Sequence, residues 1–271
     1  MKVALVTGAS SGIGESTAVE LQKAGYTVYA AARRVRRMEG LAARGIRTLL
    51  MDVTDDESMA GGVGKIIAET GRIDLLVNNA GYGSYGAVED VPLDEARYQF
   101  EVNVFGLARL IQLVAPHMRA AGSGRIVNIS SIGGRIYEPL GAWYHSTKFA
   151  VEGLSDSVRL ELKPFGIDVV VVQPGGIKTE WGGIAVGNLE KTSGGGAYEG
   201  QVRQLAGFHA QMGRASEPKV IADVVVKAAR ARRPRTRYAA GFGAKPMLFA
   251  RGVLPDRAFD AMFLGLMRRF G

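Results

Sequence analysis

The sequence predicts a single α/β domain, built on a doubly wound parallel sheet of about seven strands with helices on both faces. Two observations lead to this fold class. Short apolar runs alternate along the chain with longer helix-like segments, which is the pattern of parallel strands joined by crossover helices. A length of 271 residues fits one large domain, and the sequence contains neither an internal repeat nor a linker. We therefore expect one domain over residues 1–271.

The strands are expected where apolar residues form short runs bounded by polar or glycine positions. These runs cover residues 3–7, 27–32, 47–51, 73–78, 126–130, 169–173 and 237–240. Helices are expected between them, at residues 15–24, 55–70, 94–120, 143–163 and 217–231. The segment 182–196 is rich in glycine and has little periodicity. We expect a mobile loop there, within a lid or substrate loop at about 179–215.

The composition excludes several kinds of chemistry. The chain has no cysteine, which rules out disulfides and thiolate catalysis. Its three scattered histidines lack the spacing of metal ligands, so we expect no metal. No apolar run is long enough to span a bilayer, and the first strand begins too early to leave room for a targeting peptide. These features predict a cytoplasmic protein with no transmembrane segment.

A net charge of +8 raises the question of a nucleic-acid partner. Much of the positive excess lies in two clusters, at residues 33–37 and 230–237. No nucleic-acid-binding motif accompanies either cluster. We interpret them as solvated surface or as a site for a small anionic ligand, and we expect no nucleic acid.

A glycine-rich turn, Thr7-Gly8-Ala9-Ser10-Ser11-Gly12-Ile13-Gly14, joins the first strand directly to the first helix. Glycines let the backbone approach a pyrophosphate closely, and the start of a helix offers N–H groups and the positive end of the helix dipole. Asp52 stands at the end of the third strand. This order of strand, turn and helix predicts a dinucleotide site on a Rossmann fold.

Tyr144 and Lys148 are four residues apart, so they lie on the same face of the helix expected at 143–163. A tyrosine has an ordinary pKa of about 10, and a neighbouring lysine cation lowers it toward the range of a general base. Ser131 lies thirteen residues upstream, at the end of a strand, with Ser130 as the alternative. Each residue alone could be ordinary helix surface or strand end, but the combination indicates an acid–base site.

The chain resembles the short-chain dehydrogenase/reductase family across nearly its whole length. The glycine spacing is that of the single-domain branch, and it differs from that of the larger sugar-nucleotide epimerases. The motifs that carry the resemblance are Thr7-Gly8-x-x-x-Gly12-x-Gly14, Asp52-Val53, Asn78-Asn79-Ala80-Gly81, Asn103, Ser131, Tyr144, Lys148, and Pro174-Gly175 followed by Thr179.

The resemblance implies a role for each of four catalytic residues. Tyr144 would give its proton to the substrate oxygen as hydride arrives from the nicotinamide, and Ser131 would stabilise the charge that develops on that oxygen. Lys148 would hold the cofactor ribose and depress the pKa of Tyr144. Asn103, within the helix at 94–120, would anchor a water that links Lys148 to solvent.

The resemblance also implies contacts with a nicotinamide dinucleotide. The glycine turn would hold the pyrophosphate, the end of the third strand the adenine, and the segments after the fourth and sixth strands the adenosine ribose and the nicotinamide. The expected cofactor residues are Gly8, Ser10, Ser11, Gly12, Ile13, Gly14, Arg33, Asp52, Val53, Asn79, Ala80, Gly81, Tyr144, Lys148, Pro174, Gly175, Ile177 and Thr179.

The end of the second strand distinguishes the two nicotinamide cofactors. NAD-specific sites place an acid there, which accepts from the ribose 2′-hydroxyl. This chain has Ala32, followed by Arg33 and Arg34, and guanidinium groups suit a 2′-phosphate. We therefore expect NADP(H) to be preferred over NAD(H), with a solvated basic turn as the alternative interpretation.

The segments that form the substrate pocket in this family carry apolar side chains here. They are Ile132, Tyr137, Leu140, Trp143 and Trp181, with Phe208 and Met212 on the expected lid. If they do not belong to the core or an interface, they favour an apolar carbonyl substrate.

We therefore expect an NADP(H)-dependent oxidoreductase of the 17β-hydroxysteroid dehydrogenase-like kind, which interconverts a hydrophobic ketone and a secondary alcohol. The alternatives are a 3-oxoacyl-thioester (acyl-carrier-protein) reductase and a nucleotide-sensing regulator without turnover. Regulators of that kind typically lose the tyrosine or the lysine, and this chain retains Tyr144 and Lys148.

A C-terminal extension at about 243–271 is predicted to contain an amphipathic helix that starts near Pro255 and Asp256. Its apolar stripe consists of Phe259, Met262, Phe263, Leu266, Met267 and Phe270. We expect the stripe to pack on the protein's own body or on a partner subunit, with peripheral membrane contact as the alternative. A homodimer or homotetramer is expected, because family members commonly pair through the helices that correspond to 94–120 and 143–163.

Overall fold

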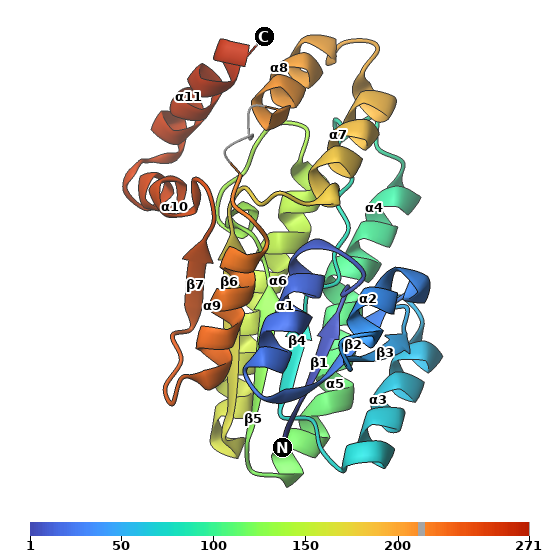
Figure 1. Cartoon of the computed structure of the whole chain (residues 1–271). Helices are drawn as coiled ribbons and strands as arrows, with labels where there is room; N and C mark the ends of the chain where they lie inside the picture. Colours follow the sequence, from blue (N-terminus) through green and yellow to red (C-terminus); the bar gives the residue numbers. More distant parts are fainter. Residues whose placement is uncertain (211–214, 271) are drawn as a thin grey trace.

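In the computed structural model, which describes residues 1–210 and 215–270, the chain forms a seven-stranded sheet between two layers of helices (Figure 1). The strand order is β3-β2-β1-β4-β5-β6-β7, and every neighbouring pair is parallel. From β1 the strand order runs outward to β3 on one side, and from β4 it runs outward to β7 on the other. Doubly wound sheets bind ligands where the order switches, at the carboxyl ends of the strands. The predicted doubly wound α/β fold is confirmed.

Each strand lies within two residues of the segment predicted from its apolar run. Most strand residues are buried on both faces because helices cover the sheet from both sides, which explains why the runs are continuously apolar. The strands are β1 (Lys2–Thr7), β2 (Tyr26–Ala32), β3 (Arg47–Leu50), β4 (Leu75–Asn78), β5 (Gly124–Ile129), β6 (Ile167–Pro174) and β7 (Arg237–Ala240).

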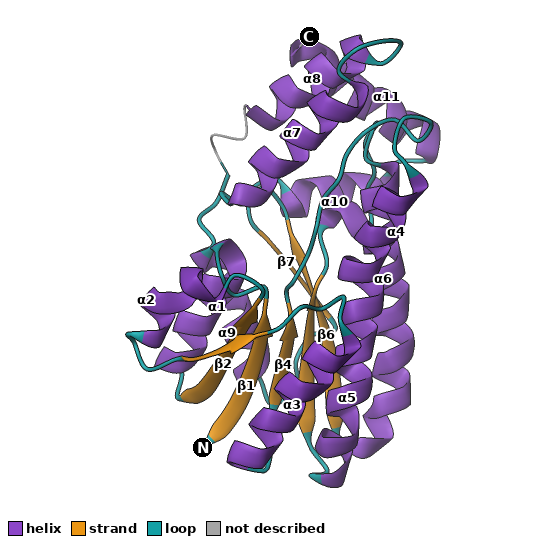
Figure 2. Cartoon of the chain, turned by 90° about the vertical axis from the view of Figure 1, so that its right-hand side faces the viewer, coloured by secondary structure: helices purple, strands orange, loops and turns teal. Residues whose placement is uncertain are grey.

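The helices divide between the two faces of the sheet, as Figure 2 shows. One face carries α1 (Gly12–Lys23), α2 (Glu39–Ala42) and α9 (Lys219–Arg230), and the other carries α3 (Asp56–Thr70), α4 (Leu93–Phe100), α5 (Gly106–Ala120) and α6 (Ala142–Leu162). Short 3₁₀ turns occur at η1 (Val35–Met38), η3 (Ile132–Gly134), η4 (Lys163–Phe165) and η6 (Arg268–Phe270). Among the described residues, no helix has both the length and the apolar content needed to cross a membrane.

The helix predicted at 94–120 is interrupted by a π-helical turn, η2 (Glu101–Phe105), between α4 and α5. Such turns insert an extra residue into a helix and are frequent at functional sites. Here the turn contains Asn103, which is buried and faces α6.

A row of buried hydrogen bonds fixes α6 to the centre of the sheet. Asn78 on β4 donates from Nδ2 to Asn128 Oδ1 on β5 at 2.9 Å, and Asn128 Nδ2 donates to Ser155 Oγ on α6 at 2.9 Å. Ser155 in turn donates to the backbone oxygen of Val151, one helical turn earlier. Because buried polar groups are costly to leave unpaired, this row specifies the position of α6 relative to β5.

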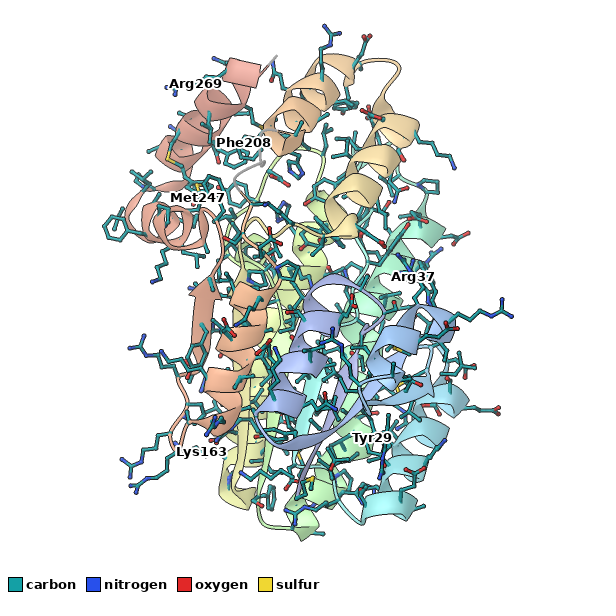
Figure 3. All side chains as sticks on the ribbon, viewed as in Figure 1. Tyr29, Arg37, Lys163, Phe208, Met247 and Arg269 are labelled. Carbon is teal, nitrogen blue, oxygen red and sulfur yellow. The ribbon has the colours of Figure 1, made fainter. Side chains whose placement is uncertain are left out.

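A further layer of helices lies beyond the carboxyl ends of the strands: α7 (Glu180–Ser193), α8 (Glu199–Ala210), α10 (Ala244–Val253) and α11 (Asp256–Met267) (Figures 1 and 2). In Figure 3, the side chains of Phe208 on α8 and Met247 on α10 lie among these helices, and both pack against the same apolar cluster.

The predicted C-terminal amphipathic helix is confirmed as α11, and its stripe packs on the protein's own body. Phe259, Phe263 and Met267 are fully buried, while Met262 and Leu266 are half-buried. The side chain of Phe270 lies outside the described residues.

The loop predicted at residues 182–196 is wrong for most of its length, because Glu180–Ser193 form α7. Ala185, Leu189 and Ser193 recur every four residues and form a buried face, which tertiary contacts stabilise despite the poor helix propensity of glycine. Ser193 Oγ donates to Asp90 Oδ2 at 2.6 Å and accepts from the backbone N–H of Ala87. These anchors come from residues about a hundred positions away, so the local sequence gave no sign of them.

Gly187→Ala should stabilise the protein by up to about 1 kcal/mol, because alanine is the better helix former and nothing lies within 4 Å of the added Cβ. Urea unfolding measures the change. The matched control is Gly71→Ala at the end of α3, where there is equal space but φ is +71°, so the same change should destabilise. A neutral or destabilising result at Gly187 alone would contradict a helical conformation there.

Candidate active site

The end of β5 and the start of α6 bring three of the predicted catalytic residues together. Ser131 is the extended residue that caps η3, and its Oγ accepts from the backbone N–H of Gly133 at 3.0 Å. The Tyr144 hydroxyl hydrogen-bonds with Ser131. Lys148, one helical turn after Tyr144, places Nζ 5.9 Å from the Tyr144 ring centroid and donates to the backbone oxygen of Ile129 at 3.1 Å. Ser130, the alternative serine, donates instead to the backbone oxygen of Ser131.

Burial controls the protonation of this group. The pKa of Tyr144 is raised to about 12, because loss of solvent around the phenolate outweighs the lowering effect of the Ser131 hydrogen bond. Burial also lowers the pKa of Lys148 to about 8, against the opposing attraction of Glu152. Burial is thus the dominant influence on both groups. The expectation that Lys148 depresses the pKa of Tyr144 stays a prediction.

Asn103 lies behind Ser131, Tyr144 and Lys148, and its side-chain amide is hydrogen-bonded to other residues of the chain. Its Oδ1 accepts from the backbone N–H of Tyr82 at 2.7 Å, and its Nδ2 donates to the Tyr82 oxygen and to Thr147 Oγ1. Thr147 is the neighbour of Lys148 on α6. Asn103 thus joins the loop after β4 to α6, and its role as a water anchor stays a prediction.

The glycine turn forms a tight cradle against the loop that follows β4. Gly8 and Gly12 have φ of +65° and +57°, and a Cβ on Gly14 would lie 2.4 Å from the Gly8 oxygen. Thr7 Oγ1 accepts from the backbone N–H groups of Asn79 and Ala80, which holds the two loops together. At the start of α1, the N-cap Ser11 makes no side-chain capping hydrogen bond. Close backbone approach beside a helix N-terminus fits the pyrophosphate of a dinucleotide.

Arginines surround the end of β2. Arg33 Nη1 donates to the Tyr98 hydroxyl at 2.6 Å and lies 3.9 Å from Asp52 Oδ2. Arg34 lies 3.9 Å from Glu180 Oε2, and Arg37 forms a bidentate ion pair with the same carboxylate. The side chains of Arg33 and Arg34 are 58% and 53% exposed, so both guanidinium groups can reach a ligand. Sequence reasoning did not anticipate the ion pairs of Glu180, because that residue lies on α7.

A cleft of about 1180 Å³ runs along the carboxyl ends of the strands and joins these parts. All the predicted cofactor residues line it except Gly14, which lies beneath the turn. Ser131, Tyr144 and Lys148 line its floor, whereas Asn103 does not reach it. The cleft continues past Tyr144 into an apolar region between α8, α10 and α11.

The predicted substrate-pocket residues divide into two groups. Ile132, Trp181 and Phe208 line the cleft, and the Trp181 ring lies 4.9 Å from the Tyr144 ring. Tyr137, Leu140 and Trp143 do not line it, so their assignment to the pocket is wrong. Tyr137 binds Asp260 on α11, Leu140 is buried with φ of +63°, and the indole N–H of Trp143 is buried without a partner. Met212 lies outside the described residues.

Several cleft residues were missed, because they come from loops and from the C-terminal helices. No sequence motif marks them, although His145 and Glu138 are close to the recognised tyrosine. They are Tyr85, Ile136, Glu138, His145, His209, Pro246, Met247, Phe263 and Leu266.

Known proteins resemble this chain in sequence. The pattern of the short chain dehydrogenase family matches residues 2–184. An uncharacterized oxidoreductase of Bacillus subtilis, YusZ, is 35% identical over 96% of each chain. An NADPH-dependent 3-dehydrocapnine reductase of Ornithobacterium rhinotracheale is 33% identical, covering 97% of this chain and 96% of its own. A 3-ketodihydrosphingosine reductase of Bacteroides thetaiotaomicron is 43% identical, but over 66% of this chain and 65% of its own.

Solved structures share the fold. A short-chain dehydrogenase from Streptomyces avermitilis superposes with a TM-score of 0.81 at 34% identity, covering 99% of this chain and 98% of that one. A metagenomic short-chain oxidoreductase in complex with NADP has a TM-score of 0.70 at 29% identity, covering 88% and 96%. An NAD⁺-bound xylitol dehydrogenase has a TM-score of 0.77 at 29% identity, covering 89% and 98%. Together these findings show that the chain is an oxidoreductase of the short-chain dehydrogenase family.

Proposed function

We propose that this protein is an NADP(H)-dependent oxidoreductase that interconverts a hydrophobic, steroid- or lipid-like ketone and its secondary alcohol. The observation that carries the proposal is the hydroxyl of Tyr144 against Ser131, at the floor of a cleft whose far end is apolar. The relatives named as reductases of 3-ketodihydrosphingosine and 3-dehydrocapnine support a lipid-like ketone. Reduction of a 3-oxoacyl thioester would use the same residues, and it remains the second candidate.

The roles of the chain's own groups follow from their protonation. With a pKa of about 12, Tyr144 keeps its proton at neutral pH and can donate it from Oη to a substrate oxygen. Ser131 Oγ would donate to the same oxygen and stabilise its developing charge. When bound, the nicotinamide cofactor would supply the hydride. Lys148, an ammonium at neutral pH, would hold the cofactor ribose.

The choice of NADP(H) over NAD(H) rests on charge at the end of β2. Ala32 offers no carboxylate there, and Arg33 and Arg34 line the cleft. A 2′-phosphate would meet two guanidinium groups, which bind phosphate well. The solved relatives bind either NADP or NAD, so a direct measurement is needed.

We also propose a cytoplasmic homodimer or homotetramer that pairs through α4–α5 and α6. Support comes from apolar side chains left on the outer surface of these helices: Phe105 is 56% exposed, Phe149 45% and Leu160 64%. Sedimentation mass would decide between these states and a monomer.

Tyr144→Phe should abolish turnover and leave cofactor affinity almost unchanged. The ring still packs, but the proton donor is lost, and acid–base assistance is typically worth about 10²–10⁴-fold. Steady-state kinetics with NADPH and a panel of steroid, long-chain and 3-oxoacyl ketones measures the effect and also separates the two candidate substrate classes. Tyr29→Phe, at a buried tyrosine far from the cleft (Figure 3), is the matched control and should keep its activity. More than about a tenth of wild-type kcat in Tyr144→Phe would contradict the role.

Lys148→Met should inactivate the enzyme while stabilising the free protein at pH 7. Burial lowers the pKa of Lys148 to about 8 from 10.5, so keeping it charged costs on the order of 3 kcal/mol below pH 8. The folded state binds fewer protons at this site than the unfolded state between these two pKa values. The free energy of unfolding of the wild type therefore rises with pH in this range. The difference by which Lys148→Met is more stable than wild type, measured by urea unfolding, should shrink from pH 7 toward pH 10. A constant difference across this range would refute the assignment.

Arg33→Ala should weaken NADPH binding about ten- to hundredfold and leave NADH binding nearly unchanged, because a hydrogen bond to a charged group contributes roughly 1.5–3 kcal/mol. Titration calorimetry with each cofactor measures this. Arg36→Ala, in the same exposed cluster but outside the cleft, is the control. Adding Ala32→Asp should then move the preference toward NADH. An equal loss for both cofactors would mean that Arg33 shapes the loop instead of binding the phosphate.

A further inference from the structure

A continuous series of polar contacts leads from Ser131 to α8. Gly133, whose N–H donates to Ser131 Oγ, accepts with its oxygen from His145 Nδ1 at 2.9 Å. The other ring nitrogen of His145, Nε2, accepts from the backbone N–H of Glu138 at 3.2 Å. Both ring nitrogens of His145 thus lie against backbone groups of the segment between Ser131 and α6. The Glu138 carboxylate then lies 3.3 Å from His209 Nε2. The series therefore ends on the helix that forms one wall of the substrate region.

Glu138 is the carboxylate at the centre of this series, and its side chain is only 12% exposed. Burial acts to raise its pKa. The hydrogen bond and charge of His209, the charge of His145 and a hydrogen bond with Tyr85 outweigh burial and hold the pKa below its ordinary value. A buried carboxylate that stays ionised needs such partners. His209 is the partner that α8 contributes, at 3.3 Å, and His145 Nε2 on α6 lies 3.9 Å from the same carboxylate oxygen.

His209 is one residue from the end of α8 and is also 12% exposed. Burial lowers its pKa, but Glu138 more than compensates and raises it above 6.5. Of the surrounding charged and titratable groups, Glu138 is the one whose charge accounts for this shift. The groups on α8 itself and on the elements around it are Tyr85, Tyr144, His145, Glu190, Lys191, Glu199, Arg203, Asp256, Arg257, Asp260, Arg268 and Arg269.

The same residues surround the catalytic tyrosine with aromatic rings. Tyr85 lies 5.5 Å from the Tyr144 ring, 6.0 Å from the His209 ring and 6.1 Å from the Trp181 ring, centroid to centroid. Next to His209, Phe208 packs on Phe263 of α11 at 5.9 Å. The end of α8 thus packs against Tyr85 through His209 and against α11 through Phe208.

We propose that His209 is a positioning residue, which seats α8 on the loop at residues 135–141 (the catalytic loop) through its ion pair with Glu138. The seated helix closes the apolar wall of the substrate region. Protonated His209 holds α8 in place, and loss of the proton releases it. Because the pair raises the pKa of His209, seating is complete below its ordinary pKa and is lost as the pH rises through the raised value. The consequence for catalysis rests on the proposed ketone reductase function, whereas the seating of α8 does not.

The test compares wild type, His209→Gln and His209→Lys between pH 6.5 and 9, using NADPH and the best ketone of the panel. His209→Gln has no cation at position 209 at any pH, so its KM for the ketone at pH 6.5 should be about tenfold above that of wild type. Its kcat and its KM for NADPH should stay within about twofold of wild type. Wild-type KM should climb toward the value of the variant as the pH rises. His209→Lys keeps its charge to higher pH and should retain a low KM there. Arg203→Ala removes an exposed ion pair with Glu199 on the same helix. This variant is the control and should match wild type.

A second measurement needs no turnover. Trypsin cleavage after Arg203 and Lys191, normalised to the cleavage of an unfolded peptide at each pH, should be faster in His209→Gln than in wild type at pH 7, with the same melting temperature within a few degrees. Faster cleavage together with the KM change supports the proposal. Wild-type protection and KM in His209→Gln, a flat wild-type pH profile, or failure of His209→Lys would overturn it. If no ketone is reduced at all, the proposed function fails, and cleavage still decides whether His209 seats α8.

Discussion

The burial of Lys148 beneath Tyr144 is the constraint on which the arrangement of the site depends. An ammonium that loses its hydration needs a fixed partner, and here this is the Ile129 oxygen at the end of β5. The charge of Glu152, one turn along α6, opposes the effect of burial on the Lys148 pKa. Glu152 is itself held by Gln173 on β6 and Arg237 on β7. The groups that balance the charge of Lys148 thus reach across β5, β6 and β7, and they tie α6 to these three strands.

The cleft has two halves that are built differently. The half proposed to bind the cofactor is made where strands end, and its parts are joined by hydrogen bonds such as those of Thr7 Oγ1 with the loop after β4. The half proposed to bind the substrate is made of helices α7, α8, α10 and α11, which contact one another mainly through apolar side chains. These helices lie outside the strand ladders, and the elements that move around ligands are drawn from the less stable parts of a structure. We therefore expect the substrate half to be the one that adapts to a ligand.

The half of the cleft made by strand ends could be predicted from the sequence, whereas much of the half made by outer helices could not. Every strand, the glycine turn and the grouping of Ser131, Tyr144 and Lys148 came from periodicity and motif spacing, because these depend on neighbours close along the chain. The helical conformation of α7 could not be read in this way, since its glycines are overruled by distant contacts of Ser193. Nor could the roles of Glu138 and His209, which are 71 positions apart in sequence and become partners only through the fold.

Two ion pairs connect the outer helices α7 and α8 to opposite ends of the cleft, and the two pairs differ in exposure. Glu180 at the start of α7 binds Arg37, and approaches Arg34, beside the cofactor-phosphate end of the cleft. His209 at the end of α8 binds Glu138 beside the catalytic end. The first pair is exposed, so it is weak and screened by salt, whereas the second is nearly buried and is costly to break. A ligand phosphate could therefore displace Glu180 from its arginines at little cost, while α8 would stay attached to the catalytic loop as long as His209 remains protonated.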